Sequence, residues 1–505
     1  MGTMENRDIS NFRSTLEYLQ QKGELLTAKD EVDTIYEVAG IQKAMENGPA
    51  LMLENIKDYP GTRIAGNMLS REQRVADIFG IPEYKDLKFK FHEAINNPLP
   101  PKIIENAPCQ EVVIKDNMDV TAILPLIKHS EVDAGRILGG GIILSSESDV
   151  TQHNDISFKR MHFRGKDWCS VNIVDGTHLS HLTHKKGRTK PVPITINIST
   201  SPSVIMVAGT STVHTIMPAG TNELGIAGAF QGFPVELCKA KTIDAYAIAD
   251  SEWVLEGYVS TESVWESEEA EKLQKRRVAP YFPEWSGYLG RASTSFKLHV
   301  SAITHRQDRP IFYTPLADSY EFENMGNPLR EACLYELAQR IAPGLIKDVN
   351  ILHAFKSYTG MVFQVQKRRS ADDAFLRNIA AVALPAGTLR MAIFVDEDVN
   401  IYNADDVLWA IATRANMRTD VFTGAPGSIG LAMLPFADMQ RDQESWSEGG
   451  MVIDATVPFR AKTKFPRSHY PVERVELKKW FTAKEIASVK AQQSEYARFL
   501  AEIGG

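Results

Sequence analysis

The sequence predicts a mixed α/β protein in which a central β-barrel or strongly bent sheet is followed by a separate α/β domain. Short segments rich in Val, Ile and Thr crowd residues 110–320, which is typical of strands bounded by turns. After about residue 317, helical and strand patterns alternate, as they do in α/β domains. The stretch NNPLPPK at 96–102 is rich in breakers and indicates a turn or linker before the β-rich part.

The chain opens with a helical pattern. Its apolar positions are Phe12, Leu16 and Leu19, and Asp8 and Ser10 are candidate caps. The central part then predicts strands at 111–116, 136–146, 168–176, 192–200, 203–211 and 296–305, with helical insertions near 222–238 and 265–277.

The C-terminal part predicts alternating elements. Helices are expected at 329–341, 371–384 and 405–415, and strands at 346–355, 361–367 and 390–400. The tail from Thr482 to Ile503 has an amphipathic pattern, and we expect it to pack on its own or a partner subunit.

Composition excludes several classes of protein. The 505 residues include 43% apolar and 24% charged residues, which are ordinary globular values. A net charge of −8 gives no electrostatic reason to expect nucleic-acid binding. Four cysteines without a C-x-x-C pair exclude a zinc ribbon and are too sparse for a secreted disulfide scaffold. No apolar run approaches the ~18 to 20 residues of a membrane span, so we expect a cytoplasmic protein without a membrane span.

Common catalytic motifs are absent from the sequence, including the P-loop, H-E-x-x-H and G-x-S-x-G. The glycines at 139–141 do not fit a dinucleotide-binding motif, and they indicate a close strand approach or a bulge. His178, His181 and His184 recur every three residues. On a helix the first and last lie about 120° apart, and on a strand neighbours face opposite ways, so at most one or two could bind one ion. Imidazole with carboxylates would suit manganese or magnesium better than zinc.

Three carboxylates stand in unusual surroundings. Asp155 precedes Arg160 by five residues, an offset that puts the two on opposite faces of a strand, so a shared site requires a bent or irregular segment. Glu223 lies at an expected helix start, where it would stabilise the helix dipole. Glu284 lies among aromatic residues; it is either a solvated loop residue or a proton donor.

Five segments, in order, resemble the UbiD family of prenylated-flavin-dependent decarboxylases. They are DAGRILGGGIILSSESD with NDISFKRM, DGTHLSHL with PVPITINI, NELGIAGAFQGFPVELCKAKTIDAYAIADSEWVLEG, PEWSGYLG, and VDEDVNIYNADDVLWAIATR. The resemblance implies an N-terminal flavin-binding part with a split β-barrel, similar to flavin reductases, and a C-terminal α/β oligomerisation domain. The expected parts are an N-terminal α/β segment at 1–105, the barrel at 106–318, the oligomerisation domain at 319–470 and a helical tail at 471–505.

The resemblance also implies roles for individual residues. Glu284 would be the catalytic proton donor, and Arg160 would meet the substrate carboxylate and the flavin. The cofactor-binding residues would be Asp155, Ser157, Phe158, Lys159, Arg160, Thr177, His178 and Glu223. Among these, Asp155, His178 and Glu223 would hold a divalent metal, manganese or else magnesium or iron, on the cofactor phosphate, with potassium as a further ion.

The implied reaction is the reversible, non-oxidative decarboxylation of an aromatic or heteroaromatic acid, free or as its CoA thioester, through a covalent prenylated-FMN adduct. Loss of carbon dioxide from a ring carbon leaves an anion that no side chain can stabilise, so a cofactor must act as the electron sink. The implied partners are the small aromatic acid, carbon dioxide, a flavin prenyltransferase that supplies the cofactor, and further copies in a homodimer or hexamer. The alternatives are a flavin reductase or other oxidoreductase on a similar barrel, and a structural subunit of a multi-subunit carboxylase.

One position departs from the family. Cinnamate-type members have a second glutamate five residues before the acid, whereas this chain has Ala279, and its sequence offers no clear replacement. The chain therefore looks closer to the branch that acts on acids such as protocatechuate or vanillate.

Overall fold

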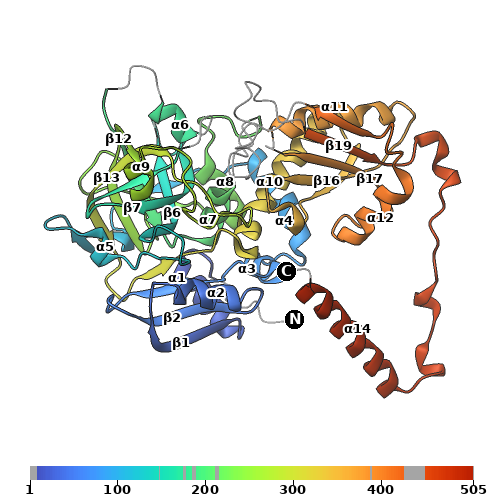
Figure 1. Cartoon of the computed structure of the whole chain (residues 1–505), viewed down its shortest axis with the longest axis horizontal. Helices are drawn as coiled ribbons and strands as arrows, with labels where there is room; N and C mark the ends of the chain where they lie inside the picture. Colours follow the sequence, from blue (N-terminus) through green and yellow to red (C-terminus); the bar gives the residue numbers. More distant parts are fainter. Residues whose placement is uncertain are drawn as a thin grey trace. The chain divides into compact units, whose positions relative to one another are not determined.

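The computed structural model describes residues 8–146, 148–173, 178–184, 189–210, 215–386, 389–425 and 450–503. For His178, Gly424, Ala425 and residues 494–503 it describes the backbone alone. The chain divides into two compact units, Met1–Thr456 and Val457–Gly505 (Figure 1). The finer subdivision at residues 105, 318 and 470 stays a prediction.

A small sheet forms the N-terminal part of the first unit. Its strand order is β1 (Leu25–Val32), β2 (Ala50–Ile56), β3 (Arg63–Gly66) and β14 (Ile311–Tyr313). Helix α1 (Phe12–Gln21) precedes it, and α2 (Glu37–Ala44), α3 (Glu72–Phe79) and α4 (Leu87–Asn96) follow its strands. The predicted helix caps were wrong, because Asn11 is the N-cap and accepts a hydrogen bond from the Ser14 amide at 2.9 Å.

The predicted barrel is confirmed. In the described part of the chain it consists of β12 (Trp253–Trp265), β9 (Val192–Ile198), β6 (Ile137–Ser145), β7 (Asp155–Phe163), β8 (Trp168–Val171) and β13 (Thr294–His305), and pairing of β12 with β13 closes it. Strand β5 (Val112–Ile114) extends it beyond β13. The bulge predicted at the glycines is present as a register shift between Leu138 and Gly141. A Cβ on Gly141 would lie 2.3 Å from the Met161 side chain, so the packed barrel interior requires glycine there.

Two short helices cover the outer face of β7, namely α7 (Pro202–Gly209) and α8 (Glu223–Gln231). The segment 203–211 was predicted as a strand, and that prediction was wrong. All eight residues of α7 are buried, so its apolar run shows no periodicity that could separate a buried helix from a buried strand. Pro202 at the first turn favours the helix.

The predicted α/β domain is confirmed as a sheet of order β15 (Ile346–Asn350), β16 (Gly360–Val365), β17 (Met391–Asp396), β19 (Gly450–Ala455) and β18 (Val421–Ala425). Alternate side chains of β16 and β17 face two different cores. Phe363 and Phe394 pack on the side of α11 (Asp372–Ala386), and Val362 and Ile393 on the side of α12 (Ala404–Arg414) (Figure 1).

Helix α10 (Tyr320–Ile341) joins the parts of the first unit. It contacts α4, α7, α11 and β15, and its buried residues belong to one core that also contains residues from α1 and β17. One core is therefore shared by the outer face of the barrel, the N-terminal sheet and one face of the C-terminal sheet, whereas the barrel interior forms a separate core.

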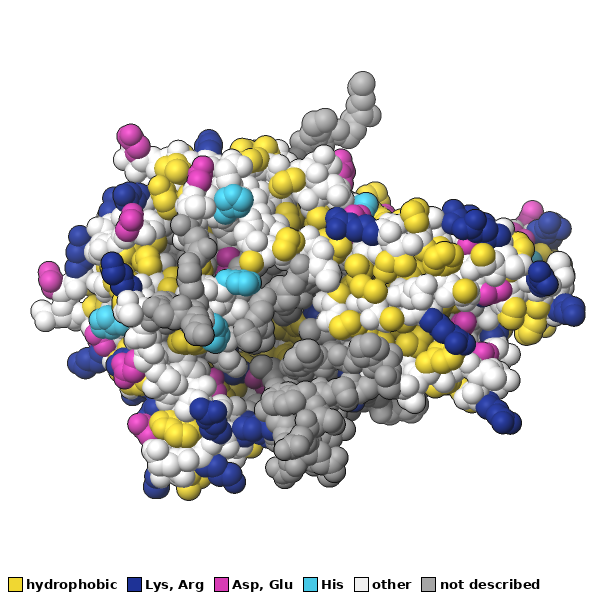
Figure 2. All heavy atoms as spheres, turned by 90° about the horizontal axis from the view of Figure 1, so that it is seen from above, with side chains coloured by type: hydrophobic (Ala, Val, Ile, Leu, Met, Phe, Trp, Pro, Cys, Tyr) yellow, Lys and Arg dark blue, Asp and Glu magenta, His cyan; other side chains and the backbone are white. Residues whose placement is uncertain are grey.

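The second unit contains α14 (Ala483–Ile503), in agreement with the helical pattern of the tail. Within the described helices, none combines the length and the apolarity needed to cross a membrane. Acidic and basic side chains are interspersed over the described part of the face that Figure 2 shows.

Candidate active site

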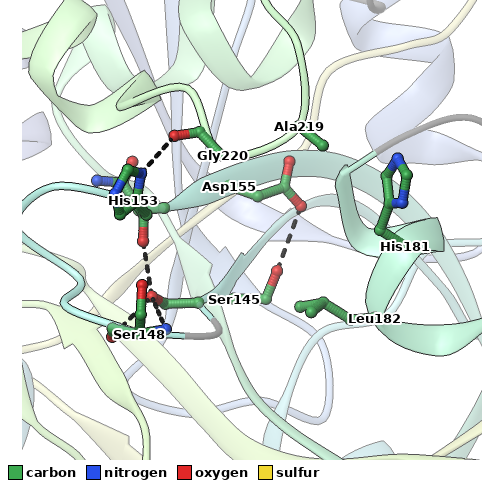
Figure 3. Close-up of a pocket in the computed structure, with 10 residues that line it drawn as sticks. Ser145, Ser148, His153, Asp155, His181, Leu182, Ala219 and Gly220 are labelled. Atoms are coloured by element: carbon green, nitrogen blue, oxygen red, sulfur yellow. Dashed lines mark hydrogen bonds between the residues drawn. The ribbon is translucent and has the colours of Figure 1, made fainter. Parts of the chain in front are cut away.

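A cavity of about 240 Å³ opens beside the start of β7. Figure 3 shows the Asp155 carboxylate and the His181 ring among its walls. Ser145, at the end of β6, donates its hydroxyl to Asp155 Oδ2 at 3.3 Å. The other lining residues come from neighbouring loops and from α6 (His178–Thr183): Ser146, Ser148, His153, Asn154, Leu182, Ala219 and Gly220. The cavity wall is thus a carboxylate surrounded by hydroxyl and imidazole groups.

Asp155 and Glu223 form a pair of buried carboxyls. Asp155 begins β7 and Glu223 begins α8, and their side chains are hydrogen-bonded to each other. Glu223 Oε2 also accepts the Ile156 amide at 2.7 Å. Burial and the neighbouring Asp155 charge raise the pKa of Glu223 well above its ordinary value. Two carboxyls in this arrangement favour a bound cation, because a cation removes their mutual repulsion.

Neighbouring residues explain why Asp155, and not Asn154, is the candidate cation ligand. Both ends of the Asn154 amide are occupied, since it donates to Val150 O and accepts from the Leu224 amide, at 2.8 Å each. Ser157 donates its hydroxyl to Asp155 Oδ2 at 3.1 Å. Glu223 also lies at the start of α8, where its charge would stabilise the helix dipole. A role as cation ligand and a role in stabilising the helix are therefore compatible.

Two further predicted cofactor residues lie on β7. Lys159 lies near both carboxyls: burial lowers its pKa, while the charges of Asp155 and Glu223 oppose that shift. Phe158 contacts Phe322 of α10 edge to face, with ring centroids 6.5 Å apart. β7 therefore connects the carboxyl pair to the core of the first unit.

The histidine segment is only partly described. Thr177 lies outside the described residues, and His178 begins α6 without a described side chain. His181 lines the cavity, whereas the His184 ring packs against Phe296 at 4.9 Å. The side chains of His181 and His184 therefore lie in different environments. This agrees with the expectation that the three histidines cannot all bind one ion. In the described part of the chain no three His, Cys, Asp or Glu side chains form a metal cluster, so the three-ligand set stays a prediction.

Arg160 and Glu284 form a second, separate cluster. The Arg160 guanidinium donates a hydrogen bond to Glu284 Oε1, and it lies over the rings of Tyr281 and Phe282 at 5.1 and 4.6 Å. Burial alone would lower the pKa of Arg160, but the Glu284 charge and hydrogen bond raise it above its ordinary value. The arginine therefore stays a cation in an aromatic setting.

Glu284 is buried, with 4% of its surface exposed, so the solvated-loop interpretation was wrong. Its amide donates to Tyr288 O at 2.9 Å, and the Gly290 amide donates to Phe282 O at 2.7 Å. These bonds fold the loop back on itself. A Cβ on Gly290 would lie 2.8 Å from Glu284 Cγ, so the absence of a side chain at 290 makes room for the carboxyl.

The two clusters lie on opposite faces of β7. Met161 and Phe163 point into the barrel core, so Arg160, of opposite parity, faces outward, and Asp155 has the parity of Met161. The register shift in this region lies in β6, the strand paired with β7, and not in β7 itself. The structure therefore brings together Asp155 with Glu223 and Arg160 with Glu284.

The comparisons with known proteins all match this chain to decarboxylases. Three domain descriptions of 3-octaprenyl-4-hydroxybenzoate carboxy-lyase match: the N-terminal domain over 16–91, the Rift-related domain over 102–318 and the C-terminal domain over 323–455. Gallate decarboxylase of Lactiplantibacillus plantarum is 30% identical over 457 residues, which cover 87% of this chain and 91% of that protein.

Solved structures agree with this match. An apo 3,4-dihydroxybenzoic acid decarboxylase from Enterobacter cloacae superposes with a TM-score of 0.81 at 27% identity, covering 94% of this chain and 99% of that one. An evolved dimeric UbiD-class enzyme from Pelotomaculum thermopropionicum in complex with prFMN has a TM-score of 0.79 at 25% identity, covering 94% and 100%.

Proposed function

This chain belongs to the UbiD family of carboxy-lyases, and from that premise we propose that it decarboxylates an aromatic or heteroaromatic ring acid, with Arg160 as carboxylate anchor and Glu284 as proton donor. Non-oxidative decarboxylation is the activity of its relatives, including the gallate and 3,4-dihydroxybenzoic acid decarboxylases. We propose a hydroxylated ring acid as the substrate because both of these relatives act on one.

The buried Arg160–Glu284 pair is the observation that supports this proposal most directly. A guanidinium has five N–H donors, so Arg160 can hold Glu284 and a substrate carboxylate at the same time. The rings of Tyr281 and Phe282 beside it provide an apolar surface for an aromatic ring. Such a surface favours neutral carbon dioxide over the charged carboxylate.

Glu284 would deliver the proton. Its carboxyl is buried beside the anchor, so the ring carbon would receive the proton from Glu284 and not directly from bulk water. After carbon dioxide leaves, this proton replaces it on the ring carbon. Glu284 would take up a proton from solvent before the next turnover. In the reverse direction Glu284 would accept the proton, which makes the reaction reversible in principle.

The residues present fit the prenylated FMN that the family implies. Asp155 and Glu223, with His178, would hold a divalent ion, manganese or else magnesium or iron, against the cofactor phosphate, and potassium would be a further ion. The paired carboxyls beside the cavity support that role. Ser157 and Lys159 would add polar contacts and Phe158 an apolar one. When bound, the prenylated flavin supplies the electron sink that side chains lack.

We further propose that the protein assembles as a homodimer or hexamer and obtains its cofactor from a flavin prenyltransferase. The relative solved with prFMN is described as an evolved dimeric form, and this supports an oligomer for the present chain.

Expression together with a flavin prenyltransferase tests the function. The purified protein should contain prenylated FMN by mass spectrometry and should release carbon dioxide from at least one acid in a panel of hydroxybenzoates and heteroaromatic acids. Protein made without the prenyltransferase is the control and should be inactive. Cofactor-loaded protein that leaves every acid unchanged, and instead oxidises a nicotinamide with flavin turnover, would replace the proposal with the reductase alternative.

A further inference from the structure

A second cavity is lined by a different set of residues from the first, with no residue in common. Its volume is about 370 Å³, larger than the 240 Å³ of the cavity beside β7. It is lined by the start of α1, the turn between α8 and β10 (Glu236–Lys239), the residues after β11 (Tyr246–Ile248) and the end of β13. A hollow of this size can hold a small organic molecule.

Arg306 lines this cavity without a hydrogen bond from its guanidinium. Its side chain is four-fifths buried, and its ion pair with Glu252 is long, at 3.8 Å. Glu252 is already held by Arg13, which donates to its two oxygens at 3.1 and 2.6 Å. In the described part of the chain the Arg306 guanidinium donates to no protein acceptor. Its N–H groups can therefore bind an acceptor in the cavity.

Asp250 offers the opposite charge to the same cavity. The amides of Ser201 and of Asp250 itself bond to its carboxyl, whereas its buried Oδ2 has no hydrogen-bond partner within the described residues. Burial raises the pKa of Asp250 to about 7, and the charge of Arg306 opposes that rise only in part. A buried carboxyl oxygen without a donor is costly, so a donor from a ligand would stabilise it.

The other polar side chains of the lining are largely engaged by the protein. Gln231 accepts the Ser203 hydroxyl at 2.5 Å and donates to Phe233 O at 2.9 Å. Lys102 and Glu236 form an ion pair at 2.7 Å, in which both side chains are about half exposed. The guanidinium and the carboxyl described above are therefore the groups with unused hydrogen-bonding capacity.

Arg306 and Asp250 do not neutralise each other, since no ion pair joins the two side chains in the described structure, although both line the cavity. A ligand that satisfies both must carry an acceptor, best a carboxylate, and a separate donor such as an ammonium or a hydroxyl. Apolar side chains make up much of the remaining lining, namely Pro108, Phe233, Pro234, Val235 and Ala249. They would bury a hydrocarbon body, which favours an organic acid over an inorganic anion.

We propose that this second cavity binds a small organic acid with a separate ammonium or hydroxyl donor, and that Arg306 holds the carboxylate while Asp250 accepts the donor. α-Amino acids and hydroxylated aromatic acids share this chemistry. The site is distinct from the proposed active site, and its existence does not depend on the proposed function.

Isothermal titration calorimetry of the full chain, purified without cofactor, tests the site with a panel of α-amino acids and a panel of hydroxybenzoates. At least one compound should bind, and Arg306→Gln and Asp250→Asn should each weaken its binding about tenfold or more, as expected for a lost charge-assisted hydrogen bond. Arg309→Gln and Asp244→Asn are the matched controls, because both residues are exposed and neither lines the cavity. They should bind the compound as the wild type does.

A variant that blocks the cavity guards against unfolding of the charge variants. Ser10 is exposed and lines the cavity, so the indole of Ser10→Trp should occupy the space without disturbing the core. This variant should keep the unfolding temperature of the wild type and lose the binding.

The panel that contains the ligand distinguishes an amino acid from a hydroxylated ring acid, and a binder from either panel that responds to the variants supports the proposal. Binding that is unchanged in Arg306→Gln and in Ser10→Trp would place the compound elsewhere, such as beside Arg160, and would overturn the proposal. Absence of binding by every compound at millimolar concentration would overturn it as well.

Discussion

Asn154 and Asn222 are hydrogen-bonded through their side chains, with Asn154 Nδ2 2.7 Å from Asn222 Oδ1. Asn154 immediately precedes β7, and Asn222 is the N-cap of α8, where its Oδ1 also accepts the Gly225 amide at 2.8 Å. This bond joins two segments far apart in the sequence at the positions just before Asp155 and Glu223. It therefore fixes the carboxyl pair even without a ligand.

Glu223→Gln should remove the cation and with it the flavin, while the chain stays folded. The change leaves an oxygen for the Ile156 amide but halves the negative charge available to a metal. Metal content and flavin content after gel filtration measure the effect. Glu268→Gln is the matched control, because Glu268 is also the first residue of a helix but is exposed. Equal retention of flavin in both variants would reduce Glu223 to a helix-dipole residue.

Gly290→Ala should lower activity without loss of flavin. The new Cβ would lie 2.8 Å from Glu284 Cγ, so the carboxyl or the loop must shift, and a small misplacement of a catalytic group can cost about 100-fold in rate. Gly40→Ala is the control, since Gly40 lies in α2 with no atom within 4 Å of an added Cβ. A Gly290→Ala enzyme with the wild-type rate would show that the position of Glu284 is not critical.

His353 should make stability depend on pH. Its Nδ1 lies 2.5 Å from Glu323 Oε2 and its Nε2 3.1 Å from Glu72 Oε1. Burial alone would lower the pKa of His353, but these two partners raise it to about 9. A raised pKa means that the stabilisation is complete below the unfolded value of about 6.5 and is lost as pH rises through the folded value.

Thermal unfolding measured from about pH 6 to 10 checks this window. The midpoint of the wild type should fall across it, and that of His353→Gln should be lower and flatter. His469→Gln, at an exposed histidine 3.6 Å from Glu473, should follow the wild type. Parallel curves for the wild type and His353→Gln would count against the assignment.

The second unit should take part in self-association. Within it Tyr470, Val472 and Trp480 are 80%, 73% and 66% exposed, and large apolar side chains in this state favour an interface. Light scattering should give a mass at least twice the 56.3 kDa of one chain. Trp480→Ser should weaken the assembly, whereas Leu273→Ser, at an exposed leucine of α9 (Glu268–Leu273), should not. A single-chain mass at micromolar concentration would contradict the prediction.

Much of the fold could be predicted from the sequence, because most strands and helices have clear periodicity and turn residues at their ends. One exception is α7, where complete burial removes the pattern. The strands of the N-terminal sheet were not predicted individually either. The α1 cap was misplaced by one to three residues because Asp8, Ser10 and Asn11 are all capping residues, and only the Ser14 amide selects Asn11.

The site residues were predictable only where they lie in sequence segments that resemble the family. Asp155, Glu223, Arg160 and Glu284 were found from family segments, and the structure pairs them. The burial of Glu284 was not predictable, because its loop has no regular period in the sequence. The fold of this loop depends on backbone bonds such as that from the Gly290 amide to Phe282 O.

Substitution of Glu284 should lower the rate of decarboxylation, whereas substitution of Arg160 should weaken substrate binding. Glu284→Gln keeps the shape of the side chain and should leave flavin and substrate binding nearly intact. It removes the proton delivered to the ring carbon, and positioned acid catalysis is worth about 10² to 10⁴ in rate. Decarboxylation and solvent deuterium exchange into the product ring should fall together, because both pass through the same protonation. Glu271→Gln is the control, since Glu271 forms a comparable ion pair with Arg164 at 2.6 Å but is half exposed.

Arg160→Ala should instead weaken substrate binding. A desolvated carboxylate would lose the cation assigned to it, a loss of about 2 to 5 kcal/mol, seen mainly as a raised KM. Flavin content must be measured beside the rate, because Arg160 also meets the flavin in the proposed complex. With Ala279 where a second glutamate would stand five residues before the acid, little rescue of Glu284→Gln is expected. A Glu284→Gln enzyme with full flavin and more than about half the wild-type rate, where loss of an essential acid predicts about 10² or more, would transfer the proton-donor role to another residue.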